Sequence, residues 1–324
     1  MKDEDREVKV SFQSKEECKC PVCDTVFHRE ELRSGRLIAG TLTEELHRQY
    51  EPSAKYGEVF PLAYVITVCP ECWFASGDKD FAALPADGRD RAFDDRERRI
   101  ADTLLVFPGT DFHENRGLIN GAASHYLALR CYGFFTKEFS PTIKQGIEAL
   151  RTGWLLDEMD RKYPGQHFDW LAVLFKKKSH FFYTEAIKRE QAGRETLSGI
   201  KFFGPDTDKN YAYEGALYLS GLLQLKYGVQ DSPDRAASLD EAKRTIAKIF
   251  GLGRSSKSKP GPLLEHARNL YDTINRELNE TDECAKETSD SLWLMTARTL
   301  RVGKGRAAHA DRVRAGARAG LSRR

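Results

Sequence analysis

The chain has 324 residues, of which 40% are hydrophobic and 31% charged, so we expect one large or two ordinary globular domains. The formal net charge is +2, but residues 301–324 hold eight Arg or Lys against one acidic residue, which leaves 43 basic and 48 acidic residues before them. A mildly acidic folded part argues against a general surface for nucleic acids or other polyanions.

The sequence also predicts where the protein works. Its N-terminus is charged and lacks the apolar segment of a signal peptide. The longest apolar run, at residues 215–225, is too short for a membrane span. Seven cysteines, four of them in two close pairs, suit a reducing cytosol better than a disulfide framework. We therefore expect a cytoplasmic protein without a membrane segment.

Residues 1–82 are predicted to form a small zinc-ribbon-like β module. Apolar and polar residues alternate around Phe12, as in a short strand. Residues 42–50 have the composition of a short helix. Residues 62–68 are rich in β-branched and aromatic residues and lead into Cys69 as a strand. A strand that runs into a cysteine motif is typical of a zinc ribbon.

The rest of the chain carries almost only helical patterns. Residues 83–113 are highly charged and are predicted to be a linker, helical near residues 96–105. Residues 114–300 are predicted to form a helical, tetratricopeptide-like domain, and the Arg-rich residues 301–324 a basic disordered tail. The predicted helices span residues 119–132, 141–162, 168–191, 211–227, 234–250, 262–274 and 283–300. The fold class is therefore mainly α, with a small zinc-ribbon-like β module followed by helical hairpins.

The sharpest chemical signal is a pair of Cys-Pro-x-Cys motifs, which begin at Cys20 and Cys69. Four thiolates in two pairs complete the tetrahedral coordination of zinc and leave no position for a substrate. We therefore predict one structural Zn²⁺ and no catalytic residue. Ordinary buried cysteines, two local disulfides and a redox dithiol are the alternatives. The predicted metal ligands are Cys20, Cys23, Cys69 and Cys72.

Two features depart from a compact ribbon. The 45 residues between the motifs exceed the roughly 15–20 of a compact ribbon, so an insertion is expected to loop out. The motifs are followed by Asp24 and Trp73, where glycine would best supply a positive φ. The predicted basic neighbours of the sulfurs are Lys19, Arg29 and Arg33.

Several other cysteines and histidines are predicted to lie outside the ligand set, because four thiolates already close it. Cys18 is interpreted as a spectator, and His28 and His47 as surface residues. Cys131 and Cys284 fall on helical patterns and are predicted to be core thiols.

The helical part has loose features of tetratricopeptide repeats. Ala123 and Tyr126 fit the first half of the pattern, and Ala242 with Ile246 fits the second. The spacing from Gly221 to Ala242 is too long for the usual repeat of about 34 residues, so an irregular helical bundle is the alternative.

Two other patterns bear on function. Residues 176–183 combine three lysines with aromatic residues, as nucleic-acid-binding surfaces do, but such a run is more often a solvated helix face. The acidic charge of the fold favours the second interpretation. The sequence contains no phosphate loop, GxSxG or HExxH motif, so we predict that the protein is not an enzyme. His113 to Asn115 is interpreted as a helix start.

These motifs resemble an uncharacterised bacterial family, catalogued as a domain of unknown function, over roughly residues 15–280. Its members pair a CPxC…CPxC module with a tetratricopeptide-like helical region. The resemblance implies this fold and a zinc site, and it implies no known activity. It rests on the two cysteine motifs, on residues 33–37, 61–64 and 74–81, and on helical segments at 149–155, 218–222 and 242–243.

The sequence therefore favours a non-enzymatic cytosolic scaffold, in which a zinc module supports a helical array that binds a protein or peptide. The alternative is a nucleic-acid-associated zinc-ribbon protein that uses Arg33, Arg36 and the Arg-rich tail.

Overall fold

The computed structural model describes residues 10–33, 35, 37–197, 200, 202–230, 234–251 and 261–280. Residues 1–271 form one compact unit and residues 272–324 a second, and each is described by itself. In the second unit, residues 272–280 are helical. The predictions for Arg36, for Cys284, for the helix at 283–300 and for the tail lie outside the described residues.

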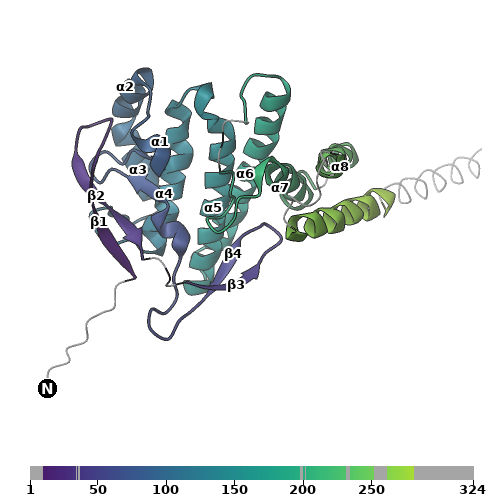
Figure 1. Ribbon diagram of the computed structural model, residues 1–324, viewed down its shortest axis with the longest axis horizontal. Helices are drawn as coiled ribbons and strands as arrows, with labels where there is room; N and C mark the ends of the chain where they lie inside the picture. The colour runs from purple at the N-terminus through teal and green to yellow at the C-terminus, as the bar shows by residue number, and fades with distance from the viewer. Residues whose placement is uncertain are drawn as a thin grey trace, which may run out of the picture. The chain divides into compact units, whose positions relative to one another are not determined.

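Within the described residues, the N-terminal part of the chain contains three antiparallel hairpins (Figure 1). Each is a separate two-stranded sheet, and the turns of the first and third carry the two cysteine motifs. The pairs are β1 (Ser11–Lys19) with β2 (Val26–Leu32), β3 (Ile38–Leu42) with β4 (Arg48–Glu51), and β5 (Ile66–Val68) with β6 (Ala75–Gly77). Strands that lead into the cysteine motifs are therefore confirmed.

The second hairpin stands where the sequence predicted a helix at residues 42–50, and that prediction was wrong. The Thr43 hydroxyl accepts a hydrogen bond from the His47 backbone N–H at 3.2 Å, and Thr43 N–H donates to the His47 carbonyl at 2.9 Å. Leu46 adopts a positive φ of 61° and is fully buried. A local side-chain bond and the burial of Leu46 thus outweigh the helical spacing of the apolar residues.

A short 3₁₀ helix, η1 (Pro61–Tyr64), replaces the first half of the predicted strand at 62–68. Its buried face packs on α4 (Leu118–Cys131). The approach is close, because a Cβ atom at Gly121 would lie 2.7 Å from the Cβ of Ala63. Close packing on α4 explains why this segment leaves the strand conformation until Ile66.

The rest of the described chain is helical, which confirms the mainly α fold. The predicted helix start at residues 113–115 was wrong, since α4 begins at Leu118. The other elements are α1 (Asp78–Phe81), α2 (Ala86–Asp94), α3 (Arg96–Val106), η2 (Tyr132–Phe134), η3 (Lys137–Phe139), α5 (Pro141–Lys162), α6 (Phe168–Gln191), α7 (Ala212–Tyr227), α8 (Arg235–Gly251) and a helix over residues 261–280.

Helices that follow one another in the chain pack side by side, α4 on α5, α5 on α6, α6 on α7 and α7 on α8 (Figure 1). Gly221 allows the last contact, because a Cβ there would lie 2.6 Å from Cδ1 of Ile246. Packing of chain neighbours is what helical hairpins require. The assignment of these hairpins to tetratricopeptide repeats stays a prediction, as do the domain boundaries.

None of the helices in the described part of the chain combines the length and the apolar content that a membrane crossing needs.

Candidate metal centre

The first cysteine motif forms a tight turn at the end of the β1–β2 hairpin. Cys20 N–H donates to the Thr25 carbonyl at 2.9 Å, and Asp24 N–H donates to the Cys20 carbonyl at 3.1 Å. The Val22 N–H points at the Cys20 Sγ, 3.4 Å away. Asp24 takes a positive φ of 60°, which aspartate tolerates better than most residues.

The second motif repeats this geometry between β5 and β6. Cys69 N–H donates to the Phe74 carbonyl at 2.9 Å, and Trp73 N–H donates to the Cys69 carbonyl at 3.0 Å. Trp73 has a φ of 56° and packs its ring edge-on against Phe112, with ring centroids 5.1 Å apart. Packing of the indole holds this residue in a conformation that glycine would adopt without strain.

The two turns bring their four sulfur atoms within 4.8 Å of one another. The Sγ atoms of Cys20 and Cys72 are 3.6 Å apart, and those of Cys23 and Cys69 are 3.5 Å apart. These separations are far longer than the bond of about 2.05 Å in a disulfide. Cys23 is partly buried and the other three are fully buried. Four converging thiols form a possible metal site.

The thiols influence one another strongly. Contacts with Cys20 and Cys72 lower the pKa of the Cys69 thiol to about 2. The contact with Cys69 raises the pKa of Cys20 to about 12, and contacts with both neighbours raise that of Cys72 well above its usual range. A metal ion binds these sulfurs as thiolates, so its binding would release the protons of the protonated thiols.

Arginines of α3 hold the second motif. The fully buried Arg99 donates from Nη2 to the Cys72 carbonyl at 2.7 Å and from Nη1 to the Ala92 carbonyl at 2.9 Å. Arg96 donates to the Glu71 carbonyl at 3.1 Å. No local sequence pattern predicts these contacts, because only the fold brings α3 to the motif.

The basic neighbours predicted from the sequence have other partners. Lys19 pairs with Asp24, Arg29 with Asp78 and Glu31, and the Arg33 guanidinium lies over the ring of Phe12.

Replacing Arg99 with methionine is expected to destabilise the protein by about 2–4 kcal/mol, because the buried carbonyls of Cys72 and Ala92 lose their donors. Urea unfolding measures this loss, and competition with a chelator measures metal retention, which should fall as well. Arg98→Met is the matched control, since that side chain is 78% exposed on the same helix. Equal unfolding midpoints for the two variants would contradict this role of Arg99.

Among the described residues, the other cysteines and histidines with a prediction follow it, with one exception. Cys18 lies outside the four-sulfur group, Cys131 is a fully buried core thiol and His28 is exposed. His47, predicted at the surface, is partly buried, with its Nδ1 2.6 Å from the Asp206 carboxylate and its ring stacked on Trp154. His47 and Asp206 are 159 positions apart in the chain, so no local pattern reveals their contact.

Fold and site together define a class of mainly helical proteins in which N-terminal hairpins gather two Cys-Pro-x-Cys motifs. The chain belongs to the bacterial family described as "Uncharacterized protein conserved in bacteria (DUF2225)", which it matches over residues 13–274. A relative described as "Uncharacterized protein" from Borreliella burgdorferi is 36% identical over 273 residues, which cover 83% of this chain and 98% of the relative. No solved structure matches the chain. The family resemblance seen in the sequence is thus confirmed.

Proposed function

We propose that the protein is a non-enzymatic cytosolic scaffold, in which a structural zinc ion stabilises the N-terminal hairpins and the helical part binds another protein. The observation that carries this proposal is an exposed apolar stripe on α6. The free thiols of the described cysteines support a reducing compartment.

Zinc is supported by the donor atoms and their spacing. An all-sulfur ligand set favours zinc over harder cations such as magnesium. Ligands about 2.3 Å from a tetrahedral centre are about 3.8 Å apart, close to the two sulfur separations of 3.5 and 3.6 Å. Because four thiolates fill the coordination sphere, the ion has a structural role and takes no part in chemistry.

One side of α6 presents large apolar side chains to solvent. Trp170 and Phe181 are 60% and 59% exposed, and Val173 and Leu174 are 40% and 41% exposed. Their positions follow the three- and four-residue spacing of a single helix face. Exposed apolar side chains gathered on one helix face are typical of a protein-binding surface.

The charges on this stripe indicate what it binds. Lys177 and Lys178 are exposed within it, whereas Lys176 turns inward to the Asp157 carboxylate at 2.5 Å. Apolar residues at helical spacing beside two ammonium groups complement an amphipathic helix with carboxylates along its rim. The partner we propose is therefore an acidic amphipathic helix of another protein.

A synthetic pair of peptides tests this proposal. An amphipathic helix with glutamates flanking its leucines is expected to bind the purified full chain, and the same helix with lysines is not. Leu174→Ser is expected to weaken binding about tenfold, as loss of a central apolar contact does. Phe93→Ser is the matched control, because Phe93 is 56% exposed on α2. Binding that ignores both the peptide charge and Leu174 would refute the proposed surface.

The nucleic-acid alternative has its own measurement. In filter binding at low salt, we expect no affinity of the full chain for single- or double-stranded nucleic acid. Tight binding that weakens steeply with added salt would favour the alternative, since phosphate contacts produce that dependence.

A further inference from the structure

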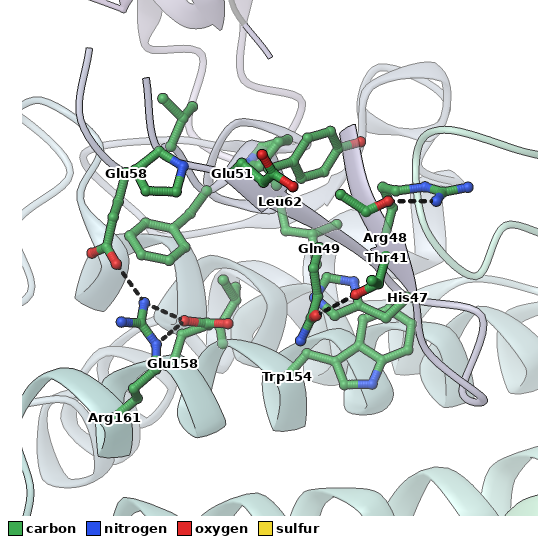
Figure 2. A pocket seen from close by; sticks show the side chains of 17 residues that line it. Thr41, His47, Arg48, Gln49, Glu51, Glu58, Leu62, Trp154, Glu158 and Arg161 are labelled. Carbon is green, nitrogen blue, oxygen red and sulfur yellow. Dashed lines mark hydrogen bonds and ion pairs between the residues drawn. The ribbon is translucent and has the colours of Figure 1, made fainter. Parts of the chain in front are cut away.

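The insertion between the two cysteine motifs helps to form a pocket. The β3–β4 hairpin in this insertion and the segment that follows it lie over α5 and line a pocket of about 390 Å³ (Figure 2). Aromatic and apolar side chains form much of the wall: Tyr50, Pro52, Val59, Phe60, Leu62, Trp154 and Leu155. A mostly apolar pocket with a few polar groups is what small-molecule and side-chain binding sites share.

Ring stacking and a hydrogen bond fix one wall of the pocket. The His47 ring stacks on Trp154, with centroids 4.3 Å apart and planes 13° apart. Burial alone would raise the pKa of Asp206, but the hydrogen bond and charge of His47 bring that pKa below its usual value. The ionised carboxylate only accepts hydrogen bonds, so Nδ1 of His47 donates to it at 2.6 Å.

Among the other polar groups of the pocket, the atoms without a hydrogen-bond partner in the described chain are mainly acceptors. Arg161 donates to Glu58 and to Oε2 of Glu158, so it is already paired with carboxylates. Arg48 is likewise bound, to Asp208 and to the Gly40 carbonyl. Oε1 of Glu158 and both oxygens of Glu51 make no hydrogen bond or ion pair within the described part of the chain. Figure 2 shows Glu158 and Arg161 on one side of the pocket and Gln49, His47 and Trp154 on the other.

A neighbouring hollow of about 210 Å³ adds to the negative charge. It shares His47, Gln49, Trp154 and Glu158 with the pocket. Its further charged residues are Glu44, Glu45 and Asp157 against Lys226. Carboxylates therefore outnumber arginine and lysine side chains on both sides of the stacked His47 and Trp154 pair.

We propose that this pocket binds an organic cation, a guanidinium or ammonium group carried on an apolar chain. The apolar chain would lie against the apolar wall of the pocket, and the cationic head beside its carboxylates. It would donate hydrogen bonds to Glu158 Oε1 and to Glu51. This site is separate from the partner-binding stripe of α6 and does not depend on it.

Matched probes test the charge preference. Binding of N-acetyl-arginine methylamide to the full, metal-loaded chain is measured by calorimetry, beside the citrulline and glutamate analogues. The arginine probe is expected to bind about tenfold tighter than the neutral citrulline probe, and the glutamate probe more weakly still. Equal affinity for the three probes, or no binding at millimolar concentration, would overturn the proposal.

Variants locate the binding. Glu51→Gln and Glu158→Gln are each expected to weaken the arginine probe about fivefold or more without changing the citrulline probe. Glu51 has no ion pair in the described chain, so its replacement leaves folding intact. Glu97→Gln, an exposed change on α3, is the control and should leave all affinities unchanged. Unchanged arginine binding in both pocket variants would place any site elsewhere and refute this one.

Discussion

Replacing Cys20 or Cys69 with serine is expected to abolish metal binding. The wild-type chain should carry about one equivalent of zinc, and each variant close to none, because a hydroxyl replaces one of four thiolates. The lost binding energy is folding energy, on the order of 10 kcal/mol in small zinc modules, so the hairpins that hold the motifs should lose their order. Metal analysis and hydrogen exchange of residues 11–32 and 66–77 measure the two effects.

Cys18→Ser is the matched control for this experiment. Cys18 lies in the same hairpin as Cys20 but outside the four-sulfur group, so metal content and melting should stay at wild-type values. A wild-type chain that is purified free of metal and melts as the loaded chain does would disprove the structural metal site.

Glu148→Gln is expected to destabilise the protein by about 3–5 kcal/mol, the usual effect of breaking a buried ion pair. Glu148 lies in α5 and is almost fully buried between His125 and Arg151. Nε2 of His125 also faces the Leu62 carbonyl at 2.8 Å, and Arg151 donates to the Pro205 carbonyl at 2.7 Å. Removing the central carboxylate leaves buried cationic donors without their anion, at a point where four segments of the chain meet.

The same carboxylate predicts a pH dependence. Burial would raise the pKa of Glu148, but the charges of Arg151 and His125 bring it below its usual value. A carboxyl group whose folded pKa is depressed contributes stability above its unfolded pKa, near 4.3, and loses it as the pH falls through the folded pKa. Wild-type stability should therefore fall below about pH 4.3 more steeply than that of Glu148→Gln.

Asp160→Asn, on the same helix, is the control for both measurements, because Asp160 is only partly buried. Its effect should stay within about 0.5 kcal/mol, as for ordinary surface changes. A Glu148→Gln variant that unfolds at the wild-type midpoint, and loses stability at low pH as the wild type does, would contradict this role of Glu148.

Features of this protein that are encoded in short stretches of sequence could be predicted. The predicted helices at residues 141–162 and 168–191 have the same limits as α5 and α6. The two cysteine motifs identified the sulfur group, because their chemistry is visible in four residues each. Asp24 and Trp73 do adopt the positive φ expected at those positions.

The parts that sequence reasoning missed depend on contacts between distant segments. The composition of residues 42–50 predicts a helix instead of the β3–β4 hairpin, because the burial of Leu46 cannot be seen in these residues alone. Arg99 reaches the Cys72 carbonyl across 27 residues, and His125 reaches Leu62 across 63. Such pairs have no fixed spacing, so only the folded chain reveals them.

The position of the four sulfurs has a consequence for the order of folding during synthesis. The first motif emerges from the ribosome 49 residues before the second, so its two thiols hold only half of a coordination sphere until Cys69 and Cys72 follow. A metal ion that then joins Cys23 to Cys69 closes the insertion into a ring, which removes about 4 kcal/mol of chain entropy from the unfolded state. Trp154 is synthesised later still, and the pocket wall can form only when α5 arrives. We therefore expect the metal-closed ring to be an early intermediate on which the rest of the first unit folds.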